Sequence, residues 1–385
     1  MKQLVLILIA SLFFFGCSKQ KEKSVKADKN IRILFAGDTS FGENYRGGMN
    51  ILKSKGYDYS INKLVPFLKN SDMVIANLET PVTNLRSSPL HGKKRYIHWS
   101  DIEKTPKNLI KNNIKTVSLA NNHTMDYGIK GLKESLDILK SNGIEYFGAG
   151  RNETEASIPF RFNSIINGKE INFIVAAGFE YIKDYDKKFN FYANQNSGGV
   201  NAWNETNAFN QIKALRDSDD KAFIIAYPHW WKNYSWKSED QTKLAHRMID
   251  AGADLVIGHG AHKLQEIEEY KGRWIIYSLG NFLFNTYGRY QQKKAPPFSL
   301  IAKLEISQRN YNPSFLLKLY PIVSDNRITK FQPRPVTKNE FNYVQKLVLT
   351  KSSKPKQLQK RIKIGNDSNG MHFILTLRSV ATLKR

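Results

Sequence analysis

The strongest sign of chemistry in this sequence is a pair of histidines, His259 and His262, in a loop that also contains Gly258 and Gly260. The loop follows a short apolar run at residues 255–257, which is typical of a strand buried on both faces. Imidazole nitrogens at the end of a buried strand are suited to hold a metal ion or to contact a phosphate group. The pair therefore predicts metal or phosphate chemistry at this point of the chain.

Polar side chains also follow four other apolar runs. They are acids, amides and imidazoles: Asp38, Asn77, Glu79, Asn121, Asn122, His123 and His229. One such residue at a strand end is more often a structural group than a ligand. The carboxyl ends of the strands in an α/β sheet line one crevice, however, so we expect these side chains to meet those of His259 and His262.

Together, side chains of these types would bind a divalent cation. Carboxylate and amide oxygens and neutral imidazoles suit Mn, Fe or Zn. The only cysteine is Cys17, so no thiolate is available in the body of the chain. We expect one or two ions. Four other histidines do not follow a strand and are interpreted as structural: His91, His98, His246 and His372.

The elements that must position these residues form an α/β pattern, because short apolar runs alternate with amphipathic helical stretches. The predicted strands are residues 31–36, 73–76, 116–120, 171–177, 223–227, 255–257 and 274–277. One helix is expected over residues 129–141, before Gly143. Another is expected to begin with a capping box at Ser238 and to end at Gly252.

The last hundred residues are expected to complete the same domain. Residues 298–306, 315–322 and 372–377 are predicted as strands and the stretch 340–349 as a helix, with no Pro-, Gly- or Ser-rich linker before them. The sequence thus predicts one large folded domain. It would span residues 31–335, and residues 336–385 would add a helix and a strand packed on it.

The N-terminal residues 1–17 are typical of a bacterial lipoprotein signal peptide. Residues 4–15 are apolar but too short to span a bilayer comfortably, and they lead to Cys17, where a lipid would be attached. Cleavage elsewhere or an uncleaved anchor are the alternatives. Residues 18–30 carry few apolar side chains and are expected to form a solvated tether. The domain would then be held on the extracytoplasmic face of a bacterial membrane.

The formal net charge of +25 raises the question of nucleic-acid binding. The basic residues are spread along the chain, and the sequence contains no recognition helix or RNA-binding signature, so we expect no nucleic-acid partner. Attraction to anionic lipid head groups or to an anionic envelope polymer uses the same electrostatics and matches an exported protein. A host whose proteins are rich in lysine would explain the charge equally well.

Six sequence motifs occur in a characteristic order. They are FAGD at 35–38, ANLETP at 76–81, LANNHTMDYG at 119–128, PHW at 228–230, GADLVIGH at 252–259 with His262, and YSLGNF at 277–282. Over about residues 31–335 the sequence therefore resembles the CapA-type family of poly-gamma-glutamate capsule proteins. The resemblance implies a fold related to the calcineurin-like metallophosphoesterases, with mixed β-sheets flanked by helices. It also implies a role in making, exporting or anchoring poly-gamma-glutamate or a similar capsule polymer.

The resemblance further implies two sets of metal ligands. They are Asp38 and His262 for one cation, Asn122, His229 and His259 for the other, and Glu79 between the two. His123 would donate a proton to a leaving group and Asp126 would orient it. Three departures from the metallophosphatase pattern occur: Ser40 replaces a histidine, Glu79 replaces an aspartate, and an extra residue separates His259 from His262. The missing histidine leaves one tightly held ion as an alternative to two.

The substrate is expected to contact residues outside the ligand set, namely Lys94, Arg95, Trp230 and Asn281. The basic run at residues 93–95 would meet an anionic substrate, and the aromatic residues from Trp230 onward would line a polymer chain, with a solvated loop and core packing as the alternatives. A metal-dependent hydrolase acting on a phosphoester or an anionic polymer is the expected function. A non-catalytic factor that binds or anchors polymer is the alternative. Membrane synthases are expected as partners.

Overall fold

The computed structural model describes residues 23–26, 30–166, 168–309 and 312–377. Within these ranges, none of the helices has the length and apolar character needed to cross a bilayer. The predicted signal peptide and its Cys17 lie outside the described residues.

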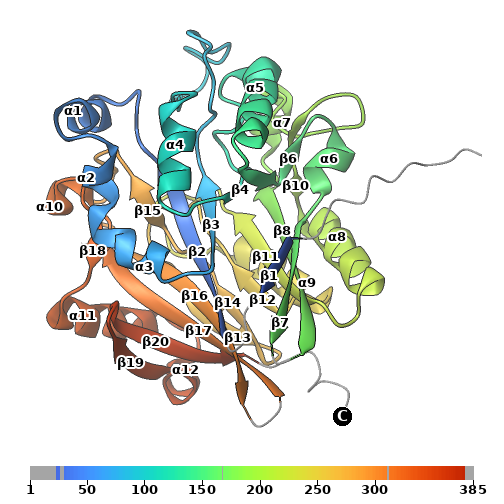
Figure 1. Cartoon of the computed structure of the whole chain (residues 1–385), viewed down its shortest axis with the longest axis vertical. Helices are drawn as coiled ribbons and strands as arrows, with labels where there is room; N and C mark the ends of the chain where they lie inside the picture. Colours follow the sequence, from blue (N-terminus) through green and yellow to red (C-terminus); the bar gives the residue numbers. More distant parts are fainter. Residues whose placement is uncertain (1–22, 27–29, 167, 310–311, 378–385) are drawn as a thin grey trace, which may run out of the picture.

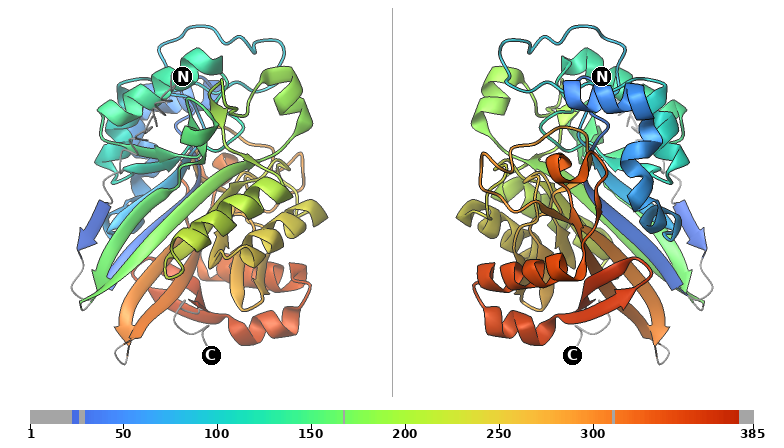
Figure 2. Two further views of the ribbon diagram at one scale, coloured as in Figure 1. Left: turned by 90° about the vertical axis from the view of Figure 1, so that its right-hand side faces the viewer. Right: turned by 90° about the vertical axis from the view of Figure 1, so that its left-hand side faces the viewer.

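Two mixed β-sheets stack face to face, and helices cover the outer face of each (Figures 1 and 2). The first sheet has the order β19 (Lys363–Asp367), β20 (Gly370–Leu377), β17 (Asn312–Val323), β16 (Phe298–Arg309), β2 (Asn30–Ser40), β3 (Met73–Leu78), β4 (Thr116–Ser118), β5 (Glu145–Phe147), with β15 (Asn281–Phe284) beside β2 and β18 (Arg334–Pro335) beside β17. The second has the order β1 (Lys23–Lys26), β7 (Phe160–Ile166), β8 (Lys169–Glu180), β11 (Phe223–His229), β12 (Leu255–Ile257), β14 (Arg273–Ile276), β13 (Ile267–Tyr270), with β10 (Ala202–Trp203) beside β8. The short strands β6 (Ala149–Gly150) and β9 (Gly199–Val200) pair separately.

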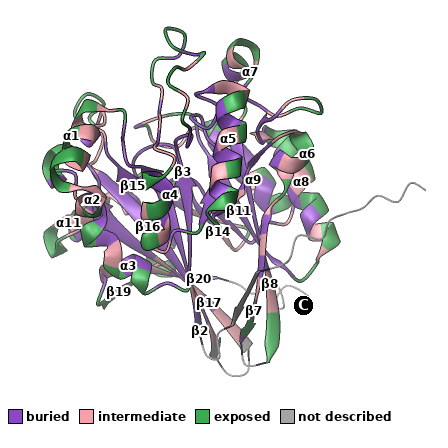
Figure 3. Ribbon diagram, turned by 45° about the horizontal axis from the view of Figure 1, so that its top comes forward, coloured by how far each residue is buried: buried purple, intermediate pink, exposed green. Residues whose placement is uncertain are grey.

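The alternation of side chains along the strands explains why both faces are buried. In β2, Ile33 and Phe35 point between the sheets, whereas Leu34 and Ala36 point toward the covering helices. Figure 3 shows the resulting pattern, with buried strands at the centre and exposed surface on the outer sides of the helices. The predicted α/β sandwich of mixed sheets flanked by helices is confirmed.

Each layer of helices belongs to one sheet. Beside the first sheet lie α1 (Arg46–Lys55), α2 (Tyr57–Ile61), α3 (Val65–Lys69), α4 (Lys104–Lys111) and α5 (Gly128–Ser141). Apolar side chains of α8 (Glu205–Ser218) and α9 (Glu239–Asp250) pack on the second sheet. The remaining helices are α6 (Glu153–Ser157), α7 (Lys183–Phe189), α10 (Asn326–Thr329), α11 (Lys338–Lys351) and α12 (Pro355–Arg361). The predicted caps are present, since Ser238 and Gln241 form a capping box on α9.

The predicted C-terminal strands and helix are also present, as β16, β17, β20 and α11. Phe341 and Val344 of α11 pack into the core between the two sheets, so this segment packs on the main body.

One expectation is wrong in part. Residues 23–26, placed in the solvated tether 18–30, form β1 and pair in parallel with β7. The tether was inferred from side chains that have little to bury. An edge strand such as β7 presents unpaired backbone groups, and pairing with these requires no apolar side chain.

Candidate metal centre

The predicted ligands meet where parallel strands of the two sheets end. Asp38 lies near the end of β2, and Glu79 directly follows β3. His229 is the last residue of β11, and His259 follows β12 by two residues. The pairing of β2 with β3 shifts register between Ala36 and Asp38, and such bulges redirect side chains near active sites.

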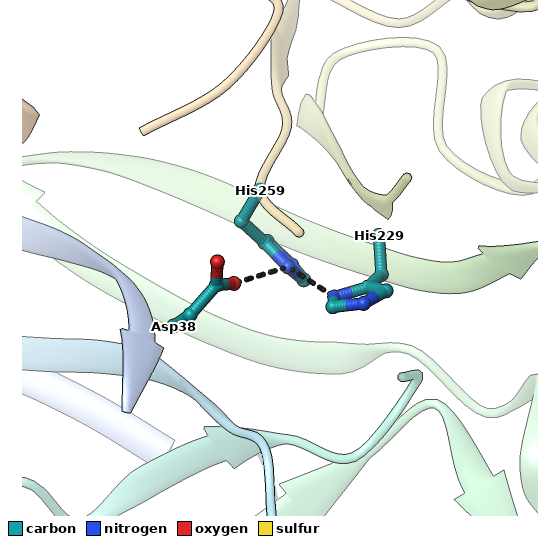
Figure 4. A group of neighbouring side chains, drawn as sticks. All are labelled: Asp38, His229 and His259. Carbon is teal, nitrogen blue, oxygen red and sulfur yellow. Dashed lines mark hydrogen bonds and ion pairs between the residues drawn. The ribbon is translucent and has the colours of Figure 1, made fainter. Parts of the chain in front are cut away.

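Asp38, His229 and His259 form the first ligand group (Figure 4). Nδ1 of His259 lies 3.0 Å from Nδ1 of His229 and 3.6 Å from Oδ1 of Asp38. Oδ1 of Asn122 lies 2.9 Å from Nε2 of His229. The structure therefore brings together the residues expected to hold one cation.

Asp38, Glu79 and His262 form the second group. Nδ1 of His262 lies 3.3 Å from Oδ2 of Asp38, and its Nε2 lies 3.9 Å from Oε1 of Glu79. Asp38 thus belongs to both groups. The family resemblance had implied that Glu79, and not Asp38, would be the carboxylate between the two cations. Glu79 belongs to the second group only among the residues that the structure describes.

The loop between His259 and His262 accommodates the extra residue with two left-handed backbone positions, Gly260 at φ +95° and His262 at φ +57°. The N–H of Gly260 donates to both carboxylate oxygens of Asp38, at 2.9 and 3.2 Å. A Cβ at position 260 would lie 2.5 Å from the carbonyl oxygen of Trp230. A side chain cannot be tolerated there without moving the loop, and a histidine at positive φ is a strain often found at functional sites.

Two buried polar atoms in the second group fit a divalent cation. Both carboxylate oxygens of Glu79 have no hydrogen-bond partner among the described residues. Such atoms cost free energy unless something satisfies them. Carboxylate oxygens, together with the imidazoles of the two groups, are donors that borderline divalent cations prefer.

The electrostatics of the group are consistent with this fit. Burial would raise the pKa of Asp38, but hydrogen bonds with His259 and His262 hold the pKa of this carboxyl well below its usual range. Burial and then the charge of Asp38 raise the pKa of Glu79 well above its usual value. Burial lowers the pKa of His229 and His259, which favours the neutral imidazole that binds metals.

Some strand-end residues support the ligands instead of joining them. Nδ2 of Asn77 donates to Oδ1 of Asp38 at 3.0 Å, and Nδ2 of Asn121 donates to Oδ1 of Asn77 at 3.0 Å. Asn281 was expected to bind substrate. Its Oδ1 instead lies 2.8 Å from Nδ1 of His262, and its Nδ2 donates to Tyr290. Asn281 therefore orients His262, which is a candidate metal ligand.

His123 and Asp126 form the expected pair, with His123 Nδ1 2.6 Å from Asp126 Oδ2. His123 Nε2 lies 3.8 Å from Oε1 of Glu79. His98, interpreted as structural, is stacked on His123 with ring centroids 3.4 Å apart, and its backbone N–H donates to the same Asp126 oxygen. Sequence reasoning missed His98 because the residue lies in a loop and not at a strand end.

A cavity of about 710 Å³ opens over this centre, and His123 and His262 line it together with Arg95, Trp231, Tyr234 and Arg289. One substrate-binding expectation needs correction. Trp230 is fully buried and donates its indole N–H to the carbonyl of Tyr277, so it packs in the core under α9 while Trp231 lines the cavity. Lys94 does line the cavity, and its buried ammonium group is paired with Asp126.

Comparisons with known proteins agree with these motifs. A family model described as bacterial capsule synthesis protein PGA_cap matches residues 32–286. The chain is 31% identical to the capsule biosynthesis protein CapA of Bacillus anthracis, over 73% of this chain and 68% of that protein. It is 30% identical to the PGA biosynthesis protein CapA of Bacillus subtilis (strain 168), over 73% and 70%. A probable polyglutamine synthesis accessory protein of Mycobacterium tuberculosis is 27% identical over 55% of each chain.

Proposed function

This chain belongs to the bacterial capsule synthesis protein family, and we propose that it is a metal-dependent hydrolase that acts on an anionic capsule polymer, poly-gamma-glutamate or a related one, or on a phosphoester. The observation that carries the proposal is the pair of ligand groups that share Asp38, next to a cavity that His262 of the second group lines. Mn, Fe or Zn are the proposed ions, in one or two positions.

The residues around the centre have separate tasks in this proposal. A divalent cation held by Asp38, His229 and His259 would polarise a substrate oxygen and activate water. Asp126 accepts a hydrogen bond from Nδ1 of His123 and so fixes the tautomer and orientation of the ring. Nε2 of His123 is then free to carry a proton to a leaving group.

The proposed location is the outer face of a bacterial membrane, with attachment through lipidated Cys17 and with membrane synthases of the polymer as partners. The support is the apolar run before Cys17 and the capsule-related names of the relatives. Mass spectrometry of the mature N-terminus in the native host tests this proposal. A diacylglyceryl group on Cys17 is expected, and an unmodified Cys17 in mature protein would contradict it.

The hydrolase proposal is tested with purified full-length protein in detergent, assayed on a generic phosphodiester and on poly-gamma-glutamate with and without a chelator. Turnover is expected to disappear with the chelator and in His259→Ala, and to persist in His246→Ala, which removes a histidine of α9 that pairs with Glu268 and does not line the cavity. Activity that survives both the chelator and His259→Ala would refute the proposal.

A second function is supported by one difference between the candidate metal ligands of this chain and those of the metallophosphatase pattern. Ser40 stands where the metallophosphatase pattern has a histidine, and its hydroxyl accepts a hydrogen bond from the N–H of Gly42 within its own loop. A non-catalytic factor that binds or anchors polymer would need the charged cavity but not a complete catalytic set. It predicts polymer retention that depends on the cavity, with no turnover of any substrate.

A further inference from the structure

We propose that Arg95, Tyr96 and Arg289 form an anion-binding subsite that holds an acidic group of the substrate beside the metal centre. The inference rests on the proposed function only in taking the cavity as the place where the substrate binds. It adds the residues that would select that substrate.

The two arginines come from loops far apart in the sequence and meet at one aromatic ring. The guanidinium carbon of Arg95 lies 5.2 Å from the centroid of Tyr96, and that of Arg289 lies 5.8 Å from the same centroid. Arg289 also lies 5.5 Å from the ring of Tyr234. All four side chains line the cavity that His123 and His262 line.

The loop that carries Arg95 and Tyr96 is anchored on both sides. Before it, the buried ammonium group of Lys94 contacts Asp126 and donates to the carbonyl of Asn122. After it, the backbone N–H of His98 donates to Asp126 at 2.6 Å. Arg95 and Tyr96 are exposed, but the residues on either side of them are held by Asp126, which also contacts His123. This anchoring limits the conformational freedom that the loop would lose on binding.

The loop that carries Arg289 is anchored to the second ligand group. Tyr290, the neighbour of Arg289, is buried, and its hydroxyl donates to the carbonyl of His262 at 2.6 Å. Arg289 is thus placed by a residue that contacts a candidate ligand directly. Both arginines are therefore next to residues that contact the metal centre or its neighbours: Lys94 beside Arg95, and Tyr290 beside Arg289.

The charges of Arg95 and Arg289 are not neutralised by other described residues of the protein. Neither arginine forms an ion pair with any of the residues that the structure describes, whereas Asp184, the acidic residue among those described as lining the cavity, is paired with Lys188 at 2.9 Å. Lys93, Lys232 and Lys293 add further positive charge to the lining. A ring under the face of a guanidinium leaves its N–H edge free to donate two parallel bonds to a carboxylate or a phosphate.

The occupant that fits is therefore an acidic group of the substrate, bound in the same cavity as the bond to be cleaved. A carboxylate of a polymer repeat and a phosphate offer the same planar or near-planar pairs of oxygens. A neutral chain of the same shape would leave the two guanidinium groups without partners. The subsite would accordingly discriminate by charge, while Trp231 and Tyr234 provide an apolar wall.

The test is equilibrium binding of defined probes to the full-length protein in detergent. The probes are an oligo-gamma-glutamate, its uncharged oligo-gamma-glutamine analogue, and a short phosphodiester oligomer. We expect the double variant Arg95→Gln/Arg289→Gln to bind the favoured acidic probe at least about tenfold more weakly than the unaltered protein. Binding of the uncharged probe and the content of bound metal are expected to stay unchanged.

Two further variants sharpen the result. Arg247→Gln removes an arginine that stacks on Phe209 at 4.1 Å on the surface of α9, and it should leave all binding unchanged. Arg289→Lys keeps the charge and loses the planar pair of donors, so it should lose affinity as well. The subsite binds carboxylates if the oligo-gamma-glutamate loses more affinity in the double variant. It binds phosphates if the phosphodiester oligomer loses more.

Equal affinity of the double variant and the unaltered protein for both acidic probes would overturn the subsite, as would an unaltered protein that binds neither of them. Failure of the hydrolase proposal is distinguishable from both results. In that case the unaltered protein turns over no substrate but still binds an acidic probe through the two arginines.

Discussion

Asp38 offers one carboxylate oxygen to each ligand group, with Oδ1 facing His259 and Oδ2 facing His262. The backbone N–H of Gly260 and the amide of Asn77 also donate to this carboxylate. Burial would raise the pKa of Asp38, but hydrogen bonds with His259 and His262 hold that pKa below its usual range, so the side chain stays ionised. In the proposed metal centre, Asp38 would be a ligand whether one ion or two is bound.

The shared position of Asp38 predicts how metal content divides among variants. Asp38→Asn should abolish binding of all ions, because an amide replaces the carboxylate of both groups. In a two-ion centre Glu79→Gln and His229→Ala should each remove about one ion per chain. Elemental analysis of the purified proteins measures this, with His91→Ala as the control. Full occupancy in Asp38→Asn would contradict the assignment of both groups.

Lys94 is a second residue whose role the structure specifies. Burial lowers its pKa, and the charge of Asp126 opposes that effect. Lys94→Met should leave Asp126 buried without its cationic partner, although the hydrogen bonds from His98 and His123 remain. Removal of one partner from a buried ion pair costs about 3–5 kcal/mol of unfolding free energy. Denaturant unfolding measures the change. Lys93→Met, next to it but exposed, should change the free energy of unfolding by less than about 0.5 kcal/mol.

Among the elements, the strands of the centre follow from the sequence more directly than the others. The apolar runs that predict β2, β3, β8, β11 and β12 are present with ends within a few residues of the expected ones. By contrast β7, a strand of alternating type near the sheet edge, and helix α8 were not expected. Runs buried on both faces stand out in a sequence, whereas half-buried strands and helices have weaker patterns.

Helix α11 allows a pH prediction at the level of an element. Glu340 closes the capping box with Thr337 and forms a bidentate pair with Arg334, and this pair holds the pKa of Glu340 at about 2. A carboxyl whose pKa is lower in the folded state than its ordinary value of 4.5 contributes stability at neutral pH. That stability is lost as the pH falls from about 4.5 toward 2.

The measurement compares the unaltered protein with Glu340→Gln. The difference in free energy of unfolding should be on the order of 2 kcal/mol at pH 7, after allowance for solvent screening, and should shrink toward pH 3. Glutamine retains a capping oxygen, so the comparison isolates the charge. A difference that stays constant between pH 7 and pH 3 would show that the Arg334 pair does not lower this pKa.

For the whole molecule, the ligand groups join the two sheets. Asp38 lies in a strand of the first sheet and Glu79 directly follows one, whereas His229 ends a strand of the second sheet and His259 follows another. The ring of Tyr227 on β11 adds a direct link, because its hydroxyl donates to the carbonyl of Ala36 on β2. A bound cation would therefore stabilise the packing of one sheet on the other, because it binds the folded state alone.

Metal removal should accordingly lower the thermal stability of the whole domain. With free metal at about 100 times its dissociation constant, binding contributes about 2.7 kcal/mol, which corresponds to a Tm difference on the order of 5 °C. Differential scanning calorimetry with and without a chelator measures the shift. Asp38→Asn should show no response to the chelator, and an unaltered protein with the same Tm in both conditions would contradict a metal that links the sheets.

The sequence by itself determined the family, the α/β class, the strands of the centre and the residue types that end them. These properties depend on local patterns, because burial on both faces and capping are recorded in neighbouring residues. Only the tertiary structure decided that Asp38 serves both groups, that His98 stacks on His123, that Trp230 packs in the core, and that Arg289 reaches Tyr96. Loop conformation and side-chain direction decide such contacts, and residues distant in the sequence determine both.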